Sequence, residues 1–161
     1  ASIAANRAMT LVDVCEPSRP TRVYVDLSSP LPFHATASGI VYMAFCQEDR
    51  LEAILEKSDF PVFTKNTANS AKTLLDCISS TRSKGYFVAS ETYDTDTVGV
   101  AVPIFDVNGF AQGTIAIVSP TLRFDGHLKQ KIIRKLFEAT SRACGQLGVD
   151  MPKSFFDLSK G

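Results

Sequence analysis

Few side chains in this sequence of 161 residues suit acid–base or nucleophilic catalysis. A nucleophilic Ser, Cys or Thr needs a base beside it, and the chain holds two histidines, His34 and His127. His34 stands two positions before Thr36, the predicted cap of a helix, so we expect it to orient that loop by hydrogen bonding. His127 follows Asp125 in the first turn of another predicted helix, where a surface role is expected. Neither histidine is predicted to be a general base.

Three acidic residues, Glu91, Asp94 and Asp96, form the one compact set of carboxylates. Paired carboxylates can exchange protons or bind a metal ion. The stretch that carries them is polar throughout and lacks the glycine and the length of a calcium loop, so a solvated loop is predicted. Gly109 and Gly113 fall in a predicted hairpin rather than in a phosphate-binding loop. We therefore expect no metal or cofactor, and an ATPase or a dinucleotide-dependent enzyme is excluded.

The four cysteines are separated by 31, 31 and 67 positions, at Cys15, Cys46, Cys77 and Cys144. No CxxC pair suits zinc or redox chemistry. Buried free thiols in a reducing cytoplasm are predicted. A thiol-dependent enzyme with Cys46 or Cys77 as nucleophile stays open as an alternative, and it would need a lowered thiol pKa.

Charge and hydropathy exclude two kinds of direct partner. The chain has 17 basic and 17 acidic residues, a formal net charge of zero and an isoelectric point near 6.9, so no uniform field gathers DNA phosphates. Its longest apolar runs, residues 40–46 and 98–105, are far shorter than the ~20 residues that cross a bilayer. A single cytoplasmic domain is predicted, without membrane contact. Because the first residue is Ala1 rather than Met, we expect the chain to be cut from something longer or processed.

Alternating side chains predict the strands that must position these residues. In residues 22–27, Val23, Val25 and Leu27 fall on one face, as in a half-buried strand. The Asn-Gly pair at residues 108–109 favours a tight hairpin turn. The strands are predicted over residues 1–5, over 9–27 as a hairpin turning at 16–20, and over 86–92, 98–105 and 110–119.

Capping residues and apolar spacing predict the helices. Thr36 and Asp125 are predicted N-caps, and Gly85 can take the left-handed conformation that ends a helix. The helices are predicted over residues 37–46, 48–57 and 69–84, with a long final helix after residue 125. The apolar stripes expected on the third and final helices consist of Ala71, Leu74, Leu75 and Ile78, and of Leu128, Ile132, Leu136, Ala139, Ala143 and Leu147. This order predicts an α+β fold with a mostly antiparallel sheet.

Four segments in this order resemble the effector-binding domain of the IclR family of bacterial transcriptional regulators. They are Pro-Phe-His-Ala-Thr-Ala-Ser-Gly at 32–39, Arg-Ser-Lys-Gly-Tyr at 82–86, Val-Pro-Ile-Phe-Asp-Val-Asn-Gly at 102–109, and Ile-Val-Ser-Pro at 117–120 with Arg123. The resemblance covers residues 1 to about 147. It implies a GAF-like fold, in which a curved antiparallel sheet of five or six strands is flanked by helices, with a long C-terminal helix.

The same resemblance implies a function for the whole of residues 1–161. Such a domain binds a small metabolite and joins subunits into homodimers or homotetramers. An N-terminal winged helix-turn-helix, absent from this chain, would read the operator DNA. The chain is therefore expected to be a single effector-binding and oligomerisation domain without catalytic activity.

Carried over by position, the family's effector pocket lies between the sheet and the loop that leads into the first helix. The Thr36 hydroxyl and the rings of Phe33, Tyr42 and Tyr93 are expected beside it. The lining is expected at Leu31, Ala37, Ser38, Gly39, Ala89, Gly99, Ala116 and Val118. Free N–H groups at the helix start would hold the acid group of an effector.

The pocket positions depart from the family pattern in one respect. Relatives that bind short keto or hydroxy acids often carry Asp at the Ala89 position, Cys at the Gly99 position, and Ser at those of Ala116 and Val118. Each unpaired oxygen of a buried short acid would cost ~1 to 3 kcal/mol here. A larger or more apolar effector, such as an aromatic acid, is therefore expected. A purely structural assembly domain with a filled pocket also stays open.

Overall fold

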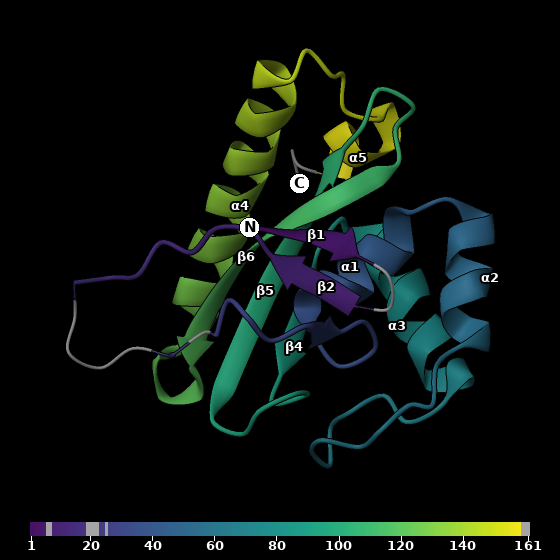
Figure 1. Ribbon diagram of the computed structural model, residues 1–161. Coiled ribbons are helices and arrows are strands. Elements are labelled where there is room, and N and C mark those ends of the chain that lie inside the picture. The colour runs from purple at the N-terminus through teal and green to yellow at the C-terminus, as the bar shows by residue number, and fades with distance from the viewer. Residues whose placement is uncertain (6–7, 19–22, 25, 159–161) are drawn as a thin grey trace.

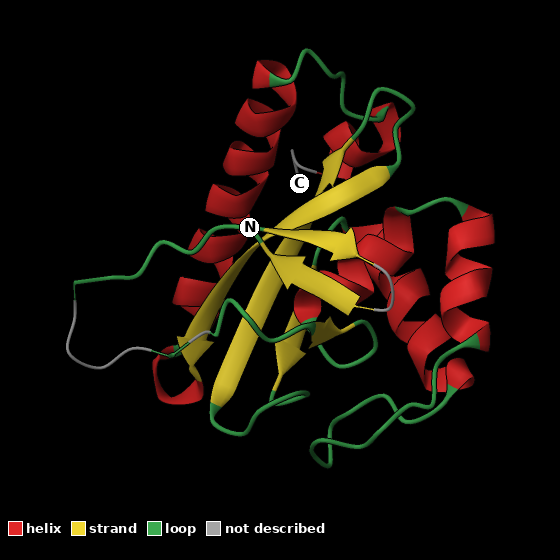
Figure 2. Cartoon of the chain, viewed as in Figure 1, coloured by secondary structure: helices red, strands yellow, loops and turns green. Residues whose placement is uncertain are grey.

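The computed structural model describes residues 1–5, 8–18, 23–24 and 26–158, which form a curled antiparallel sheet with helices on both faces (Figures 1 and 2). Its strand order is β3-β2-β1-β6-β5-β4. This half-barrel confirms the predicted α+β, antiparallel fold. The strands of the sheet are β1 (Ser2–Ala5), β2 (Ala8–Leu11), β3 (Leu31–Pro32), β4 (Phe87–Ser90), β5 (Thr97–Phe105) and β6 (Ala111–Pro120).

The two faces of the sheet carry different helices. Helix α1 packs against β4, β5 and β6 on one face, and α4 packs against β5 and β6 on the other (Figure 1). Helix α3 packs on α1, and α2 shares their apolar cluster. The helices are α1 (Ala37–Phe45), α2 (Glu48–Glu56), α3 (Ala71–Lys84), the 3-10 helix η1 (Thr121–Arg123), α4 (Gly126–Gln146) and α5 (Lys153–Leu158).

Local signals at the helix ends are confirmed. Thr36 Oγ1 accepts a hydrogen bond from Gly39 N at 3.1 Å and so caps α1. Asp125 Oδ1 accepts from Leu128 N at 2.7 Å and caps α4. Gly85 ends α3 with φ of 79°, in the left-handed region that favours glycine. The Thr36 cap sets the residue at which α1 begins.

Strand β5 is buried on both of its faces. Val100 and Val102 pack toward α4, in a cluster with Leu136. Ala101 packs on the opposite face with Val41 of α1. Because eight of the nine residues of α1 are buried and none is charged, this helix is held between the sheet and α3. The start of α1 is therefore a rigid part of the interior.

The predicted strand over residues 22–27 is wrong where the structure describes it. Val23, Tyr24, Asp26 and Leu27 belong to no strand, and β2 pairs instead with β1 and β3. The Asp26 carboxylate accepts from the backbone N–H of Ser28 at 2.8 Å, a local turn that competes with strand pairing. The predicted turn at residues 16–20 lies partly outside the described residues, and Val25 lies wholly outside them.

Other differences concern short elements and helix faces. Strand β3 and helix α5 were not predicted, and Pro32 is tolerated in β3 because this strand lies at the sheet edge. The buried stripe of α3 runs through Leu74, Ile78 and Thr81, so Leu75, expected on it, is 45% exposed. Leu147 and Ala71, also expected on apolar stripes, are likewise exposed. Within the described ranges, no helix is long and apolar enough to cross a membrane.

Candidate functional site

A cavity of about 510 Å³ lies between the start of α1, the α1-facing side of β4–β6, and the segment before β3. Its volume falls in the range of roughly 300 to 1,000 Å³ that small-molecule sites occupy. Eight of the ten residues expected at a ligand site line it. These eight are Leu31, Thr36, Ala37, Ser38, Ala89, Gly99, Ala116 and Val118.

The start of α1 presents hydrogen-bond donors at this cavity. Thr36 Oγ1 donates to Pro32 O at 3.0 Å, so its hydrogen is already used within the protein. The backbone N–H groups of Ala37 and Ser38 have no acceptor among the described residues. The Ser38 side chain is only 5% exposed and lines the cavity, and its hydroxyl also lacks a partner in the described part of the chain. Unpaired donors at the positive end of a helix dipole favour an anion.

The floor of the cavity is made of small residues from three neighbouring strands. Ala89 of β4 pairs with Gly99 of β5, which pairs with Val118 of β6, and Ala101 pairs with Ala116 in the adjoining row. A Cβ atom at Gly99 would stand 3.4 Å from the Cβ atom of Ala37. The sheet and α1 therefore approach closely here, and small side chains leave the open volume above them.

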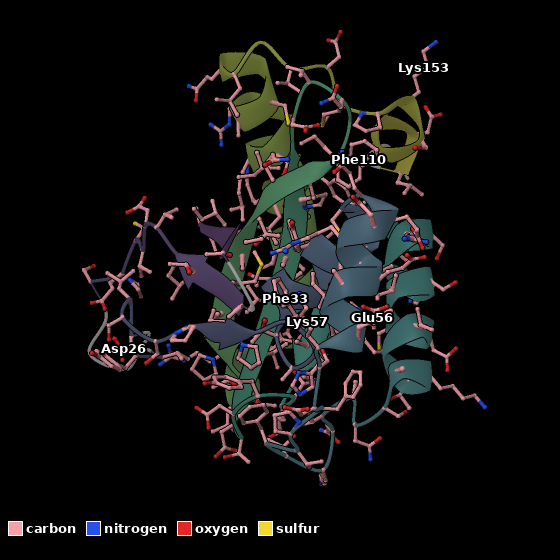
Figure 3. All side chains as sticks on the ribbon, turned by 45° about the vertical axis from the view of Figure 1, so that its right-hand side comes forward. Asp26, Phe33, Glu56, Lys57, Phe110 and Lys153 are labelled. Atoms are coloured by element: carbon pink, nitrogen blue, oxygen red, sulfur yellow. The ribbon has the colours of Figure 1, made fainter. Side chains whose placement is uncertain are left out.

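Two residues expected in the lining, Phe33 and Gly39, do not border the cavity. The ring of Phe33 stacks on Tyr42, with centroids 5.7 Å apart, inside the apolar cluster around α1, and Figure 3 shows Phe33 toward the middle of the molecule. Gly39 lies against the backbone of Phe33. Both residues support the site from behind. Tyr42, expected to offer a ring contact, is likewise absent from the lining residues.

The rest of the described lining comes from loops and from Thr97, the first residue of β5. Tyr93 was expected to supply a ring, and it does border the cavity. Phe63 belongs to the loop between α2 and α3, where no periodic pattern in the sequence marks it. Nine lining residues were not expected: Val23, Tyr24, Asp26, Ser29, Ala35, Phe63, Thr92, Asp94 and Thr97.

The histidine geometry does not indicate acid–base catalysis. The Nε2 atom of His34 lies 2.9 Å from Pro61 O, and the residue is 5% exposed. Its ring packs against Phe60 and Phe63, with centroids 5.8 Å away in both cases. The predicted role of His34 in orienting a loop is therefore confirmed.

The acidic set between β4 and β5 is built into its loop. Glu91 Oε1 accepts from the backbone N–H of Asp96 at 3.1 Å, and both residues are non-glycine residues with positive φ, 51° and 60°. Among the described residues, no group of three metal-ligating side chains comes together. Asp94 instead lies on the cavity lining.

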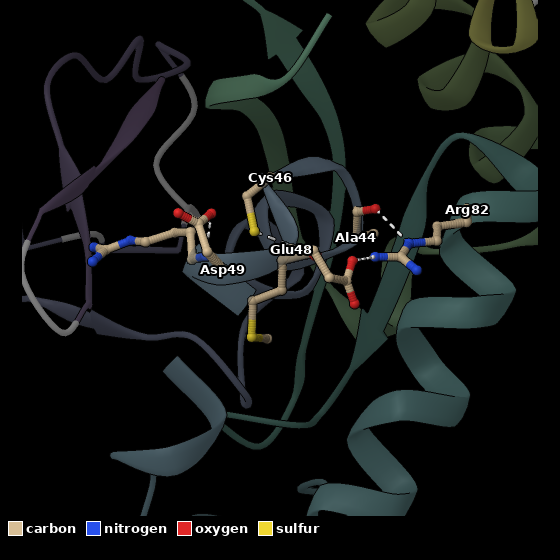
Figure 4. Close-up of polar contacts among 7 residues, drawn as sticks. Ala44, Cys46, Glu48, Asp49 and Arg82 are labelled. Carbon is tan, nitrogen blue, oxygen red and sulfur yellow. Dashed lines mark hydrogen bonds and ion pairs between the residues drawn. The ribbon is translucent and has the colours of Figure 1, made fainter. Parts of the chain in front are cut away.

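The cysteine environments oppose a thiol nucleophile. Burial raises the pKa of the Cys46 thiol to about 11, and its Sγ atom lies 3.6 Å from Met43 O. Next to it, Arg82 is engaged by Ala44 O at 2.8 Å and by the Glu48 carboxylate at 3.3 Å (Figure 4).

The other cysteines differ in exposure, and none of the four forms a disulfide. Burial also raises the pKa of Cys77, which lies half-buried in α3. Cys144 is buried, as predicted, whereas Cys15 is exposed, so the prediction of a buried thiol is wrong there.

Comparison with known proteins identifies a family and several relatives. The family model described as "Bacterial transcriptional regulator IclR C-terminal" matches residues 2–144. The HTH-type transcriptional regulator KdgR of Escherichia coli K12 is 30% identical over 127 residues, which are 79% of this chain and 48% of KdgR. XynR of the same organism is 32% identical over 102 residues, 63% of this chain and 40% of XynR. The chain thus spans less than half of these regulators.

Solved structures share the fold. The IclR structure from Thermotoga maritima has a TM-score of 0.85 at 24% identity, covering 91% of this chain and 60% of that one. The inducer-binding domain of a PobR double mutant from Acinetobacter, in complex with 3-hydroxybenzoic acid, has a TM-score of 0.75 at 21% identity. The match covers 88% of this chain and 83% of that one. An IclR homologue from Microbacterium hydrocarbonoxydans, in complex with 4-hydroxybenzoate, has a TM-score of 0.74 at 20% identity, covering 87% and 56%.

Proposed function

The chain belongs to the IclR family, and we propose that it is the effector-binding domain of a cytoplasmic transcriptional regulator. The observation that carries this proposal is the 510 Å³ cavity at the start of α1, with its unpaired donors. An open cavity favours this role over a purely structural assembly domain, whose pocket would be filled. Because the chain spans 48% of KdgR, DNA reading is assigned to a winged helix-turn-helix outside these residues.

The proposed effector is an aromatic or otherwise apolar acid. Its carboxylate would accept hydrogen bonds from the N–H groups of Ala37 and Ser38 and from the Ser38 hydroxyl. The floor at Ala89, Gly99 and Ala116 offers apolar contact and few polar partners. A short keto acid would leave oxygens unpaired on this floor, at a cost of ~1 to 3 kcal/mol each. Two proteins of the same fold bound to hydroxybenzoates support this choice.

Effector binding is proposed to act through a homodimer or homotetramer of the complete regulator. A ligand shifts an equilibrium between two subunit arrangements only if it binds them unequally. The cavity is bordered by separate elements, since α1, the sheet, the segments on either side of β3, and the α2–α3 and β4–β5 loops all contribute to it. A ligand that contacts all of these elements can change their relative positions. This change would be transmitted through the subunit arrangement to the DNA-binding domain.

Titration calorimetry tests this proposal with benzoate, 3-hydroxybenzoate and 4-hydroxybenzoate against glyoxylate and pyruvate. We expect at least one aromatic acid to bind and the short acids to bind more weakly. Ser38→Ala should weaken the binding of the aromatic acid by about tenfold or more, because it removes a hydrogen-bond donor to the charged carboxylate. It should leave thermal stability unchanged, because that hydroxyl has no partner among the described residues.

Ser141→Ala, on the exposed side of α4, is the matched control and should bind like the parent chain. If the folded chain binds none of these acids, or binds glyoxylate or pyruvate alone, the proposed function is wrong.

A further inference from the structure

We propose that Phe63 and Tyr93 form an aromatic wall that contacts the ring of the effector and selects aromatic acids over saturated acids of the same size. This inference rests on the proposed function and adds two specificity-determining residues from separate loops. Both residues line the 510 Å³ cavity. Their ring centroids lie 4.8 Å apart at an interplanar angle of 64°.

The two rings leave much of their surface open. Phe63 is 44% exposed and Tyr93 is 38% exposed, although each already packs against the other. Because the two rings lie side by side and both line the cavity, their accessible faces together offer it an apolar contact surface. Edge-to-face geometry is one of the two arrangements that aromatic rings prefer, the other being offset stacking, and a third ring can extend it. A planar ligand entering the cavity would cover both surfaces.

Hydrogen bonds hold the two loops of the wall together. The side chain of Thr64 donates to Glu91 O at 2.5 Å, and that of Thr67 donates to Thr92 O at 2.7 Å. Thr92 Oγ1 in turn donates to Ala35 O at 2.6 Å, just before α1. In Figure 1 the loop from α2 to α3 and the loop from β4 to β5 meet at the same end of the molecule. The wall is thereby joined to the residues that precede the donor-bearing start of α1.

The back of the wall is also fixed. His34 packs against Phe63 with ring centroids 5.8 Å apart, and its Nε2 atom lies 2.9 Å from Pro61 O. Two non-glycine residues near the wall, Phe60 and Glu91, have positive φ of 48° and 51°. Strained backbone of this kind persists only where the surrounding contacts require it. The loops therefore hold the rings in place before a ligand arrives, which lowers the entropy lost on binding.

The geometry divides recognition of the effector between two parts of the cavity. The start of α1 would bind the acid group that aromatic and saturated acids share. The wall would contact the planar ring, which only the aromatic acids have. Substitution of Phe63 or Tyr93 should therefore weaken the binding of an aromatic acid more than that of a saturated acid of equal charge and similar size. Substitution of Ser38 should weaken the binding of both acids alike.

Calorimetry with 4-hydroxybenzoate and its saturated counterpart, 4-hydroxycyclohexanecarboxylate, tests the wall. Phe63→Leu and Tyr93→Leu keep apolar bulk but remove a ring. Each should weaken the binding of 4-hydroxybenzoate by about 2- to 12-fold and should leave the binding of the saturated acid nearly unchanged. Tyr93→Phe, which restores the ring, should recover most of the affinity lost in Tyr93→Leu. Val62→Ala, beside the wall and 64% exposed, is the matched control.

A fluorescence measurement provides a test that does not depend on whether the leucine variants fold. The chain has four tyrosines and no tryptophan, so its tyrosine fluorescence can be followed directly. With excitation on the long-wavelength side of the tyrosine band, where benzoate absorbs little, adding benzoate should change this emission in the parent chain and change it less in Tyr93→Phe. Adding 4-hydroxycyclohexanecarboxylate should change the emission little in either chain.

The possible results separate the wall from the proposed function. If the parent chain binds 4-hydroxybenzoate and the leucine variants bind it equally well, or lose both acids equally, the wall is wrong and the effector site stands. If the parent chain binds neither acid, nor any other aromatic acid, both proposals fall.

Discussion

The Cα atom of Gly39 lies directly against the backbone of Phe33, so that the first turn of α1 touches the loop leading into it. A Cβ atom at position 39 would overlap the carbonyl group of Phe33. Glycine is required here for close approach rather than for an unusual φ. The contact sets the depth at which the N–H groups of Ala37 and Ser38 meet the cavity.

Gly39→Ala should therefore destabilise the fold by about 1 to 3 kcal/mol, because the backbone of the loop must move to admit the methyl group. Urea unfolding measures this, and calorimetry should show weaker acid binding. Gly145→Ala is the matched control, since a Cβ atom there meets nothing within 4 Å. Gly145 lies in the last turn of α4, where this change should stabilise the fold by up to about 0.5 kcal/mol, less than the gain inside a helix. Equal stability of the two variants would contradict the role assigned to Gly39.

Phe155 of α5 is 1% exposed although it lies beyond residues 2–144, the part that the family model matches. Its ring centroid lies 4.9 Å from that of Phe105 and 5.3 Å from that of Phe137. Phe155→Ala should lower the free energy of unfolding by about 3 to 5 kcal/mol. Urea unfolding measures this loss. The slope of the unfolding free energy against urea concentration should stay unchanged, as expected when only the stability differs.

Lys153→Ala in the same helix is the control for Phe155. Lys153 is exposed and points away from the body of the molecule in Figure 3. Its replacement should change the free energy of unfolding by no more than about 0.5 kcal/mol. If removing Phe155 costs no more than removing Lys153, then α5 is not part of the core.

Features that depend on a few neighbouring residues could be predicted from the sequence. Thr36, Gly85 and Asp125 end or begin helices through their own backbone preferences and hydrogen bonds, and all three occupy the expected positions. The lining at Leu31, Ala89 and Gly99 followed from resemblance, because a shared fold places equivalent strand positions on the same face.

Features that depend on distant packing could not be predicted. Phe63 and Tyr93 meet because two loops from separate parts of the chain are held together by hydrogen bonds to carbonyl groups, and neither loop carries a periodic pattern. The alternation in residues 22–27 is equally typical of a strand and of an extended segment. A local turn at Asp26 decides between them. Helix α5 has six residues, too few for a reliable periodicity.

Alkylation of the folded chain with iodoacetamide should label one thiol rapidly, that of exposed Cys15. Burial raises the pKa of Cys46 to about 11, so only about one molecule in ten thousand carries this thiolate at pH 7. Half-buried Cys77, whose pKa is also raised by burial, should react slowly. Mass spectrometry follows each site. Cys15→Ser should abolish the fast phase, and rapid labelling of Cys46 would revive the thiol-enzyme alternative.

The carboxylate of Asp26, on the cavity rim, should keep its turn intact at neutral pH and lose it in acid. Hydrogen bonds from the Ser29 hydroxyl and from the hydroxyl and N–H of Ser28, each 2.7 to 2.8 Å long, hold the pKa of Asp26 below its usual value. A group whose pKa is lowered by folding stabilises the fold above its unfolded pKa of about 3.9, and that stabilisation disappears as the pH falls through the folded value.

The amide resonance of Ser28 should therefore stay constant from about pH 8 to pH 5 and shift only below about pH 4. NMR titration of the chain measures this shift, and Asp26→Asn should remove it because the amide does not ionise. Effector affinity should be independent of this group between pH 5 and pH 8, since the Asp26 carboxylate keeps its charge throughout this range. A midpoint above the ordinary carboxyl range would mean that burial, rather than the serine hydrogen bonds, controls Asp26.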